Sequence, residues 1–175
     1  MPRCIDSASF DGAVWGQRRH RTGLVLGYID GYENYHELVD HFRGTQVKVA
    51  SITVEAHPGA KIIDVEAGAS SVATAVGWCI AKLRQGKRPT VYGGGDDLDA
   101  VYRGLQAHHY HGPLASYWLA FYVQVAPAPA QVDWFRRLPR GRSGWQFADS
   151  VATPDGHSYD CSVVSSSWVR LQGLS

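Results

Sequence analysis

Eight short segments rich in β-branched and aromatic residues recur along the 175-residue chain, and helical patterns separate many of them. Several segments are almost continuously apolar, which is typical of strands buried on both faces of a parallel sheet. Alternating strands and helices indicate an α/β fold, and eight parallel strands close a barrel. The expected strands are Arg3 to Asp6, Leu24 to Asp30, Val47 to Val54, Ile62 to Glu66, Thr90 to Tyr92, Tyr117 to Tyr122, Trp145 to Phe147 and Tyr159 to Val164.

The length of the chain limits how many helices such a barrel can hold, because a full (β/α)₈ barrel typically takes about 250 residues. The linker from Glu55 to Ala60 is too short for a crossover helix, which needs at least about ten residues with its loops. Helices are expected at Asn34 to Phe42, Ser70 to Gln85, Asp97 to Gln106 and, more weakly, Val132 to Arg137. We therefore predict one domain over residues 1–175, an α/β fold, as a compact, irregular (β/α)₈-like TIM barrel with one or more helices missing. An open doubly wound sheet is the alternative.

Charge and hydropathy remove several classes of function. The 17 Lys and Arg residues against 16 Asp and Glu residues leave a formal net charge of +1, so the whole chain gives no electrostatic reason to expect nucleic acid or an anionic membrane as a partner. No segment approaches the roughly 20 apolar residues of a membrane span, and the first residues do not resemble a signal peptide. We expect a protein synthesised in the bacterial cytoplasm without a signal peptide.

Two motifs resemble a metal-binding site and a phosphate-binding site, but the residues around them do not support either. His108-His109-Tyr110-His111 follows a helical pattern without a spaced Cys or carboxylate partner, which favours a solvated turn over a metal site. Gly93-Gly94-Gly95 precedes two acidic residues and has no Lys-Ser/Thr pair, which favours a flexible loop over a phosphate site. Cys4, Cys79 and Cys161 form no C-x-x-C pair. We expect no cofactor and no metal.

Carboxylates recur at the ends of the expected strands. Asp64 and Glu66 stand at positions i and i+2 of one segment, which in a strand places both side chains on the same side, about 6.6 Å apart along the backbone. An isolated pair of this kind commonly begins a solvated loop. Here Asp6, Asp30 and Asp160 lie in corresponding places of other strands, and the carboxyl ends of barrel strands hold the active site in such folds.

Aromatic and amide side chains fall near the ends of the fifth to seventh expected strands. They are Tyr92, Trp118, Tyr122, Trp145 and Gln146. Aromatic rings of this kind stack on sugars and an amide hydrogen-bonds to them, although a single ring of this kind belongs to the core more often than to a binding site. The combination of acids and aromatics predicts a site for a carbohydrate.

The order and spacing of these motifs resemble glycoside hydrolase family 25, the lysozyme-like muramidases of bacteria and bacteriophages, over almost the whole chain. The resemblance is nearest to short, divergent relatives of actinobacteria and their phages, in which a pattern like Gly27-Tyr28-Ile29-Asp30-Gly31 ends the second strand. The other motifs that carry it are Cys4-Ile5-Asp6-Ser7, Ile62-Ile63-Asp64-Val65-Glu66, Pro89-Thr90-Val91-Tyr92, Tyr117-Trp118-Leu119-Ala120-Phe121-Tyr122, Trp145-Gln146-Phe147 and Tyr159-Asp160.

The resemblance implies a role for each acid. Glu66 matches the general acid of the family and Asp64 its partner on the same strand, while Asp6 and Asp160 match the acids of the first and last strands. Asp30 stands where family members usually carry Glu, which leaves its contact with substrate open. Such a reaction protonates the leaving oxygen and stabilises an oxocarbenium-like centre, and clustered carboxylates with aromatic walls would favour the protonated form of the acid. Family resemblance suggests retention of configuration, with the N-acetyl group of the sugar as nucleophile.

The expected function is therefore hydrolysis of peptidoglycan glycan strands at a β-1,4 bond, in a phage-associated protein that acts at the cell wall, either as a lysis protein or as part of a virion. Peptidoglycan or another cell-wall glycan is the expected partner. The alternative is a catalytically inactive barrel that serves as a structural or glycan-binding component of a phage tail and contacts other tail proteins. The sequence shows no separate wall-binding module, which favours a tail component over a free lysis enzyme.

Overall fold

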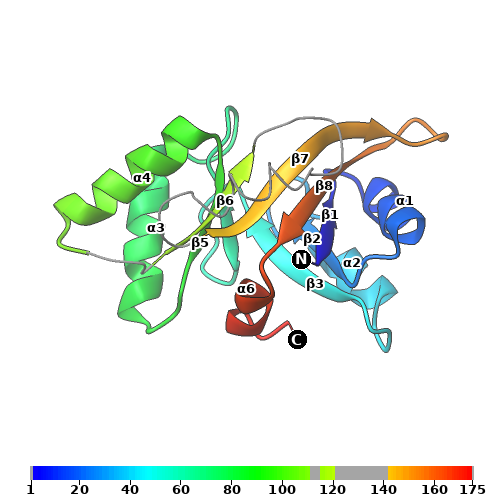
Figure 1. The fold of residues 1–175 in the computed structure, drawn as a ribbon, viewed down its shortest axis with the longest axis horizontal. Helices are drawn as coiled ribbons and strands as arrows, with labels where there is room; N and C mark the ends of the chain where they lie inside the picture. Colours follow the sequence, from blue (N-terminus) through cyan, green and yellow to red (C-terminus); the bar gives the residue numbers. More distant parts are fainter. Residues whose placement is uncertain (1, 111–114, 121–141, 175) are drawn as a thin grey trace.

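The computed structural model describes residues 2–110, 115–120 and 142–174, in which eight strands form a closed barrel in chain order (Figure 1). All eight expected strands are present. Their bounds are β1 Arg3–Asp6, β2 Leu24–Tyr28, β3 Lys48–Thr53, β4 Ile62–Asp64, β5 Thr90–Gly93, β6 Ser116–Ala120, β7 Arg142–Ala152 and β8 Ser158–Val164. The barrel excludes the open sheet, because β1 pairs with both β2 and β8.

The barrel is mixed, which corrects the expectation of an all-parallel sheet. Neighbouring strands run parallel from β1 to β7, whereas β8 is antiparallel to both β7 and β1. A tight turn joins β7 to β8, in which the Thr153 N–H donates to the His157 carbonyl at 2.8 Å. Because β8 runs the other way, its first residues lie beside the last residues of β1.

Five helices are present in the described residues, and three of them were expected. Figure 1 shows α3 and α4 together on one side of the barrel and α1 and α2 on the other. The bounds are α1 Phe10–His20, α2 Tyr35–His41, α3 Val72–Arg84, α4 Gly95–Ala107 and α6 Ser166–Leu171. The sequence patterns predicted α2, α3 and α4 but not α1 or α6. The expected helix at 132–137 lies outside the described residues.

Local sequence explains where the expected helices begin. Ser71 accepts a hydrogen bond from the Thr74 N–H and so caps α3. The glycine run before α4 is not the flexible loop that we expected, because Gly93 ends β5, Gly94 is the N-cap and the helix starts at Gly95. α1 escaped prediction because Gly12 and Gly16 interrupt its apolar pattern.

The interior of the barrel is a packed core. Leu26, Ile52, Ile62 and Trp118 belong to one buried cluster that also includes Trp168 of α6. The indole N–H of Trp168 donates to the Thr90 hydroxyl at 2.8 Å, so α6 closes the end of the barrel at which β5 begins.

Alternation along the strands decides which residues enter the barrel. In β4, Ile62 belongs to the interior cluster and Ile63 to the cluster under α3 and α4. Successive side chains of a strand point to opposite faces, so Asp64 faces the interior as Ile62 does. In β1, Cys4 is interior and Ile5 is not, which by the same rule turns Asp6 inward.

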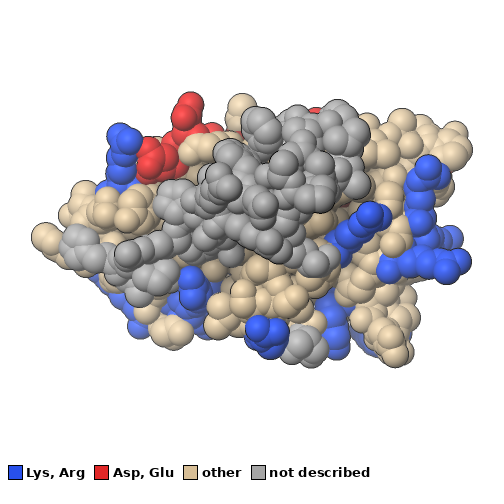
Figure 2. Space-filling model, viewed as in Figure 1, with Lys and Arg blue, Asp and Glu red and all other residues tan. Residues whose placement is uncertain are grey.

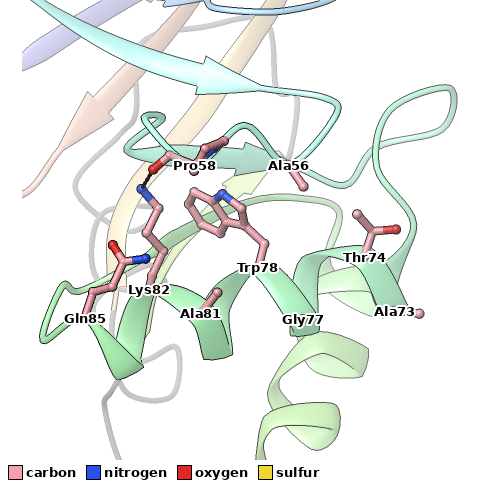
Figure 3. A pocket seen from close by; sticks show the side chains of 9 residues that line it. All are labelled: Ala56, Pro58, Ala73, Thr74, Gly77, Trp78, Ala81, Lys82 and Gln85. Carbon is pink, nitrogen blue, oxygen red and sulfur yellow. Dashed lines mark hydrogen bonds between the residues drawn. The ribbon is translucent and has the colours of Figure 1, made fainter.

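No helix lies between β3 and β4, as the short linker predicted. Side chains of α3 hold this connection instead (Figure 3). The Lys82 ammonium donates to the carbonyls of Pro58 at 2.7 Å and Ala60 at 2.6 Å, and the Trp78 indole donates to the His57 carbonyl at 3.0 Å. These bonds give donors to three carbonyl groups of the loop, which is not helical.

Replacement of Lys82 by Met is expected to lower the free energy of unfolding by about 2 kcal/mol, because two carbonyls near the loop lose their donor. Urea denaturation at pH 7 measures the change. Burial lowers the pKa of Lys82 to about 8, with a smaller effect of the charges on Lys87 and Lys61. Lys87→Met, at an exposed position beyond α3, is the matched control, and an equal loss in both variants would contradict the bracing role of Lys82.

Candidate active site

Three carboxylates face one end of the barrel interior. Asp6 is the last residue of β1, Asp64 is the last residue of β4, and Asp160 lies near the start of the antiparallel β8. Asp6 and Asp160 are direct cross-strand partners. Closure of the sheet therefore brings together Asp6 and Asp160, which are 154 residues apart in the sequence.

Asp6 lies at the centre of this group. Its side chain is only 2% exposed, and among the described residues its Oδ1 atom has no hydrogen-bond partner. Burial raises the pKa of Asp6 well above its usual value, and the charges of Asp160, Asp64, Glu66 and then Asp149 raise it further. Both effects favour the protonated form of Asp6, and the other acids lie near enough to disfavour a charge on it.

Asp64 is held by two donors. The Tyr28 hydroxyl donates to its Oδ2 at 3.3 Å, and the Glu66 backbone N–H donates to its Oδ1 at 2.9 Å. Burial raises the pKa of Asp64 to about 6, although both hydrogen bonds act in the opposite direction. The pKa of Asp64 therefore lies about two units above that of an ordinary aspartate.

Asp160 is fixed by an irregularity in β7. The register between β7 and β8 shifts between Ala148 and Val151, and Ser150 has a left-handed φ of 53°. The Ser150 N–H freed by this bulge donates to Asp160 Oδ1 at 2.7 Å. Burial raises the pKa of Asp160 to about 7, opposed by the Ser150 bond and assisted by Asp149. Bulges of this kind commonly aim side chains at functional sites.

Glu66 lies two residues beyond the end of β4, which corrects the expectation that it shares a strand with Asp64. The same-side argument for a strand therefore does not apply to this pair. Their link is the backbone hydrogen bond from Glu66 to the Asp64 carboxylate. Glu66 is half-buried and its charge acts on both Asp6 and Asp160, so it belongs to the same group of acids.

Asp30 lies apart from this group in its contacts. It follows β2 by two residues, and its carboxylate accepts hydrogen bonds from the Thr53 hydroxyl and, at 2.7 Å, from the Val54 N–H. The expectation that β2 extends to Asp30 is wrong. These contacts give Asp30 a structural role, because they tie the loop after β2 to the end of β3.

The aromatic and amide candidates divide into two sets. Tyr92, which pairs with Asp64 across β4 and β5, donates its hydroxyl hydrogen bond to Gln146, and both side chains are buried near the acids. Trp118 and Trp145 are fully buried. Trp118 packs edge-on against Trp168 in the interior, while Trp145 packs against Phe147 in a separate cluster. Tyr122 lies outside the described residues.

Two residues join the site without having been singled out in the sequence. Tyr28 is buried, and burial followed by the charges of Asp6 and Asp64 raises its pKa well above the usual value, so it stays a neutral donor. Its alternation with Leu24 and Leu26 in β2 was a signal that it faces inward. Asp149 raises the pKa of Asp160, but it lies in the bulged part of β7, where alternation gives no guide.

The part of the chain that the structure describes contains neither a metal-binding group of side chains nor a membrane-spanning helix. No group of three or more His, Cys, Asp or Glu side chains there could hold a metal ion. No helix among those residues is long and apolar enough to cross a membrane. On the face shown in Figure 2, Lys and Arg side chains stand at several separate places around the molecule.

No protein-family model, curated protein or solved structure matches this chain. The structure by itself establishes an α/β protein with a closed, mixed, eight-stranded barrel and a group of carboxylates at one end of its interior.

Proposed function

We propose that this chain is a hydrolase of peptidoglycan glycan strands, of the N-acetylmuramidase type, and that its barrel is a reduced (β/α)₈ barrel related to glycoside hydrolase family 25. The observation that carries the proposal is the convergence of Asp6, Asp64, Glu66 and Asp160 on one end of the barrel. Glycoside hydrolysis requires one carboxyl group that donates a proton and another that remains charged beside the sugar.

The environments of these acids support a division of labour. Glu66 is half-buried and lies beyond the end of β4, and it is the proposed proton donor to the leaving oxygen. Asp64 is oriented by Tyr28 and by the Glu66 N–H, and it would stabilise the positive charge that develops at the sugar. Asp6 is buried, its pKa is raised by burial and by the neighbouring acids, and it would support Asp160 across the strand pair.

A non-catalytic barrel is the second candidate, and a specific observation favours it. Asp6 and Asp64 are 2% and 5% exposed, and Trp118 and Trp145 are fully buried, so these two aromatic residues pack edge-on against core side chains and offer no face to a sugar. Such a protein would act as a structural or glycan-binding component of a phage tail. In either role we propose that the protein acts at the cell wall as part of a phage particle.

Incubation with purified actinobacterial peptidoglycan tests both candidates. New reducing ends on muramic acid, detected by borohydride reduction and mass spectrometry, are expected from the hydrolase, while chitin, which lacks muramic acid, is expected to give none. Co-sedimentation with peptidoglycan without cleavage would support the tail component instead. A chain that neither cleaves nor sediments with the glycan would overturn both proposals.

A further inference from the structure

A pocket of about 440 Å³ lies where β1 and β2 begin, beside α6. Arg3 and Leu24, which line it, are the first residues of these strands, whereas Asp6 ends β1. The pocket is therefore at the opposite end of the barrel from the carboxylates and is independent of the proposed hydrolase site. Its volume falls within the range of small-molecule sites in proteins.

The lining of this pocket has a basic part and an apolar part. Arg3, His20 and Arg21 supply the basic part, and Leu24, Val169 and Leu174 supply apolar surface. No Asp or Glu lines the pocket. A ligand that fills it should therefore combine an anionic group with a small apolar body.

The positive charges of the pocket are not neutralised by the part of the protein that the structure describes. Neither Arg3 nor Arg21 makes an ion pair within those residues, and Arg19 of α1 lies over the Trp15 ring, 5.2 Å from its centroid. Burial lowers the pKa of His20, and the charges of Arg3 and Arg19 lower it further. Two groups of β8 also face His20, the Tyr159 hydroxyl at 3.0 Å and the Cys161 sulfur at 3.8 Å.

We propose that this pocket binds a phosphomonoester with a small apolar substituent, the phosphoryl group lying against Arg3, Arg21 and His20 and the substituent against Leu24, Val169 and Leu174. Arginine guanidinium groups bind phosphate oxygens in a bidentate manner. Three cationic or hydrogen-bonding side chains match the three terminal oxygens of a phosphomonoester better than the two oxygens of a carboxylate.

The backbone at Arg21 allows a clean test of this proposal. Arg21 ends α1 with a left-handed φ of 50°, a conformation that glycine adopts without strain and that other residues adopt at a cost. Arg21→Gly therefore removes a guanidinium group that would donate hydrogen bonds to the phosphate. The melting temperature is expected to stay unchanged or to rise. Arg84→Gln, which removes one exposed positive charge from the end of α3, is the matched control for net charge.

Isothermal titration calorimetry with phenyl phosphate is the experiment. The chain is expected to bind phenyl phosphate about tenfold more tightly than inorganic phosphate, because the ring buries apolar surface, and to bind benzoate and phenol more weakly than either. Arg21→Gly and Arg3→Gln are expected to weaken phenyl phosphate binding at least about tenfold, and Arg84→Gln is expected to leave it unchanged. In a parallel NMR titration, bound phenyl phosphate should raise the pKa of His20, because an anion offsets Arg3 and Arg19.

Three results would overturn the proposal. Equal losses in Arg21→Gly and Arg84→Gln would show a diffuse effect of net charge. Equal or tighter binding of benzoate would show a carboxylate site. Failure to bind phenyl phosphate at concentrations up to about 10 mM, the weak end of specific binding, would show that the pocket does not bind phosphomonoesters.

Discussion

Glu66→Gln is expected to lower the rate of glycan-strand cleavage by roughly 10²- to 10⁴-fold, the range that a general acid contributes. Glutamine keeps the shape of the side chain and its capacity for hydrogen bonding, but its amide cannot donate a proton to the leaving oxygen. The backbone N–H of residue 66 remains as the donor to Asp64, so the other acids keep their geometry. The rate of appearance of muramic acid reducing ends from purified peptidoglycan measures the effect.

The control for this variant is Glu37→Gln, which removes an exposed carboxylate from α2, outside the group of acids. It is expected to keep the full rate of cleavage. Co-sedimentation with peptidoglycan should be the same for both variants, because the change removes a proton donor and no apolar surface. Full activity in Glu66→Gln would show that Glu66 is not the general acid. Asp160, whose pKa burial raises to about 7, would then be the candidate for that role.

Much of the barrel could be predicted because its strands are short apolar runs, and the period of two then fixes which residues face inward. This rule places Asp6 and Asp64 in the interior, where the structure has them. The same rule failed to separate Trp145 from Gln146, because a shift of one residue moves a side chain to the other face. The register with β8, in which Gln146 lies opposite Ser162, and the hydrogen bond from Tyr92 place Gln146 in the interior.

The antiparallel β8 escaped prediction, although the sequence contained a signal for it. Pro154-Asp155-Gly156 separates the seventh and eighth strand segments, and such a run between strands is typical of a hairpin turn. The role of Asp30 had no such signal, since its partners Thr53 and Val54 lie more than 20 residues away and are brought to it by the pairing of β2 with β3.

The free energy of unfolding is expected to fall as the pH rises from about 4 to 8. Burial raises the pKa of Asp64 to about 6 and that of Asp160 to about 7. A raised pKa in the folded state contributes stability below the unfolded value near 4, and this contribution disappears as the pH rises through the folded value. Each pKa unit corresponds to about 1.4 kcal/mol, so the loss from Asp160 alone is on the order of 4 kcal/mol. Urea denaturation at a series of pH values measures it.

Asp160→Asn isolates this effect. The amide oxygen can still accept the bond from the Ser150 N–H, but the side chain no longer has to carry a buried charge, so the variant is expected to be more stable than the wild type at pH 8 and not at pH 4. Asp155→Asn is the control, because the pKa of Asp155 is shifted in the opposite direction: the hydrogen bond from the Thr153 hydroxyl lowers it. Removal of the Asp155 charge should therefore give no gain in stability at pH 8. Burial of several acids at one site lowers the free energy of unfolding at pH values where they are charged, a common cost of functional sites. If the stability of the wild type rose steadily from pH 4 to pH 8, the carboxylates would not be destabilised by burial, and the group of acids on which the hydrolase proposal rests would be wrong.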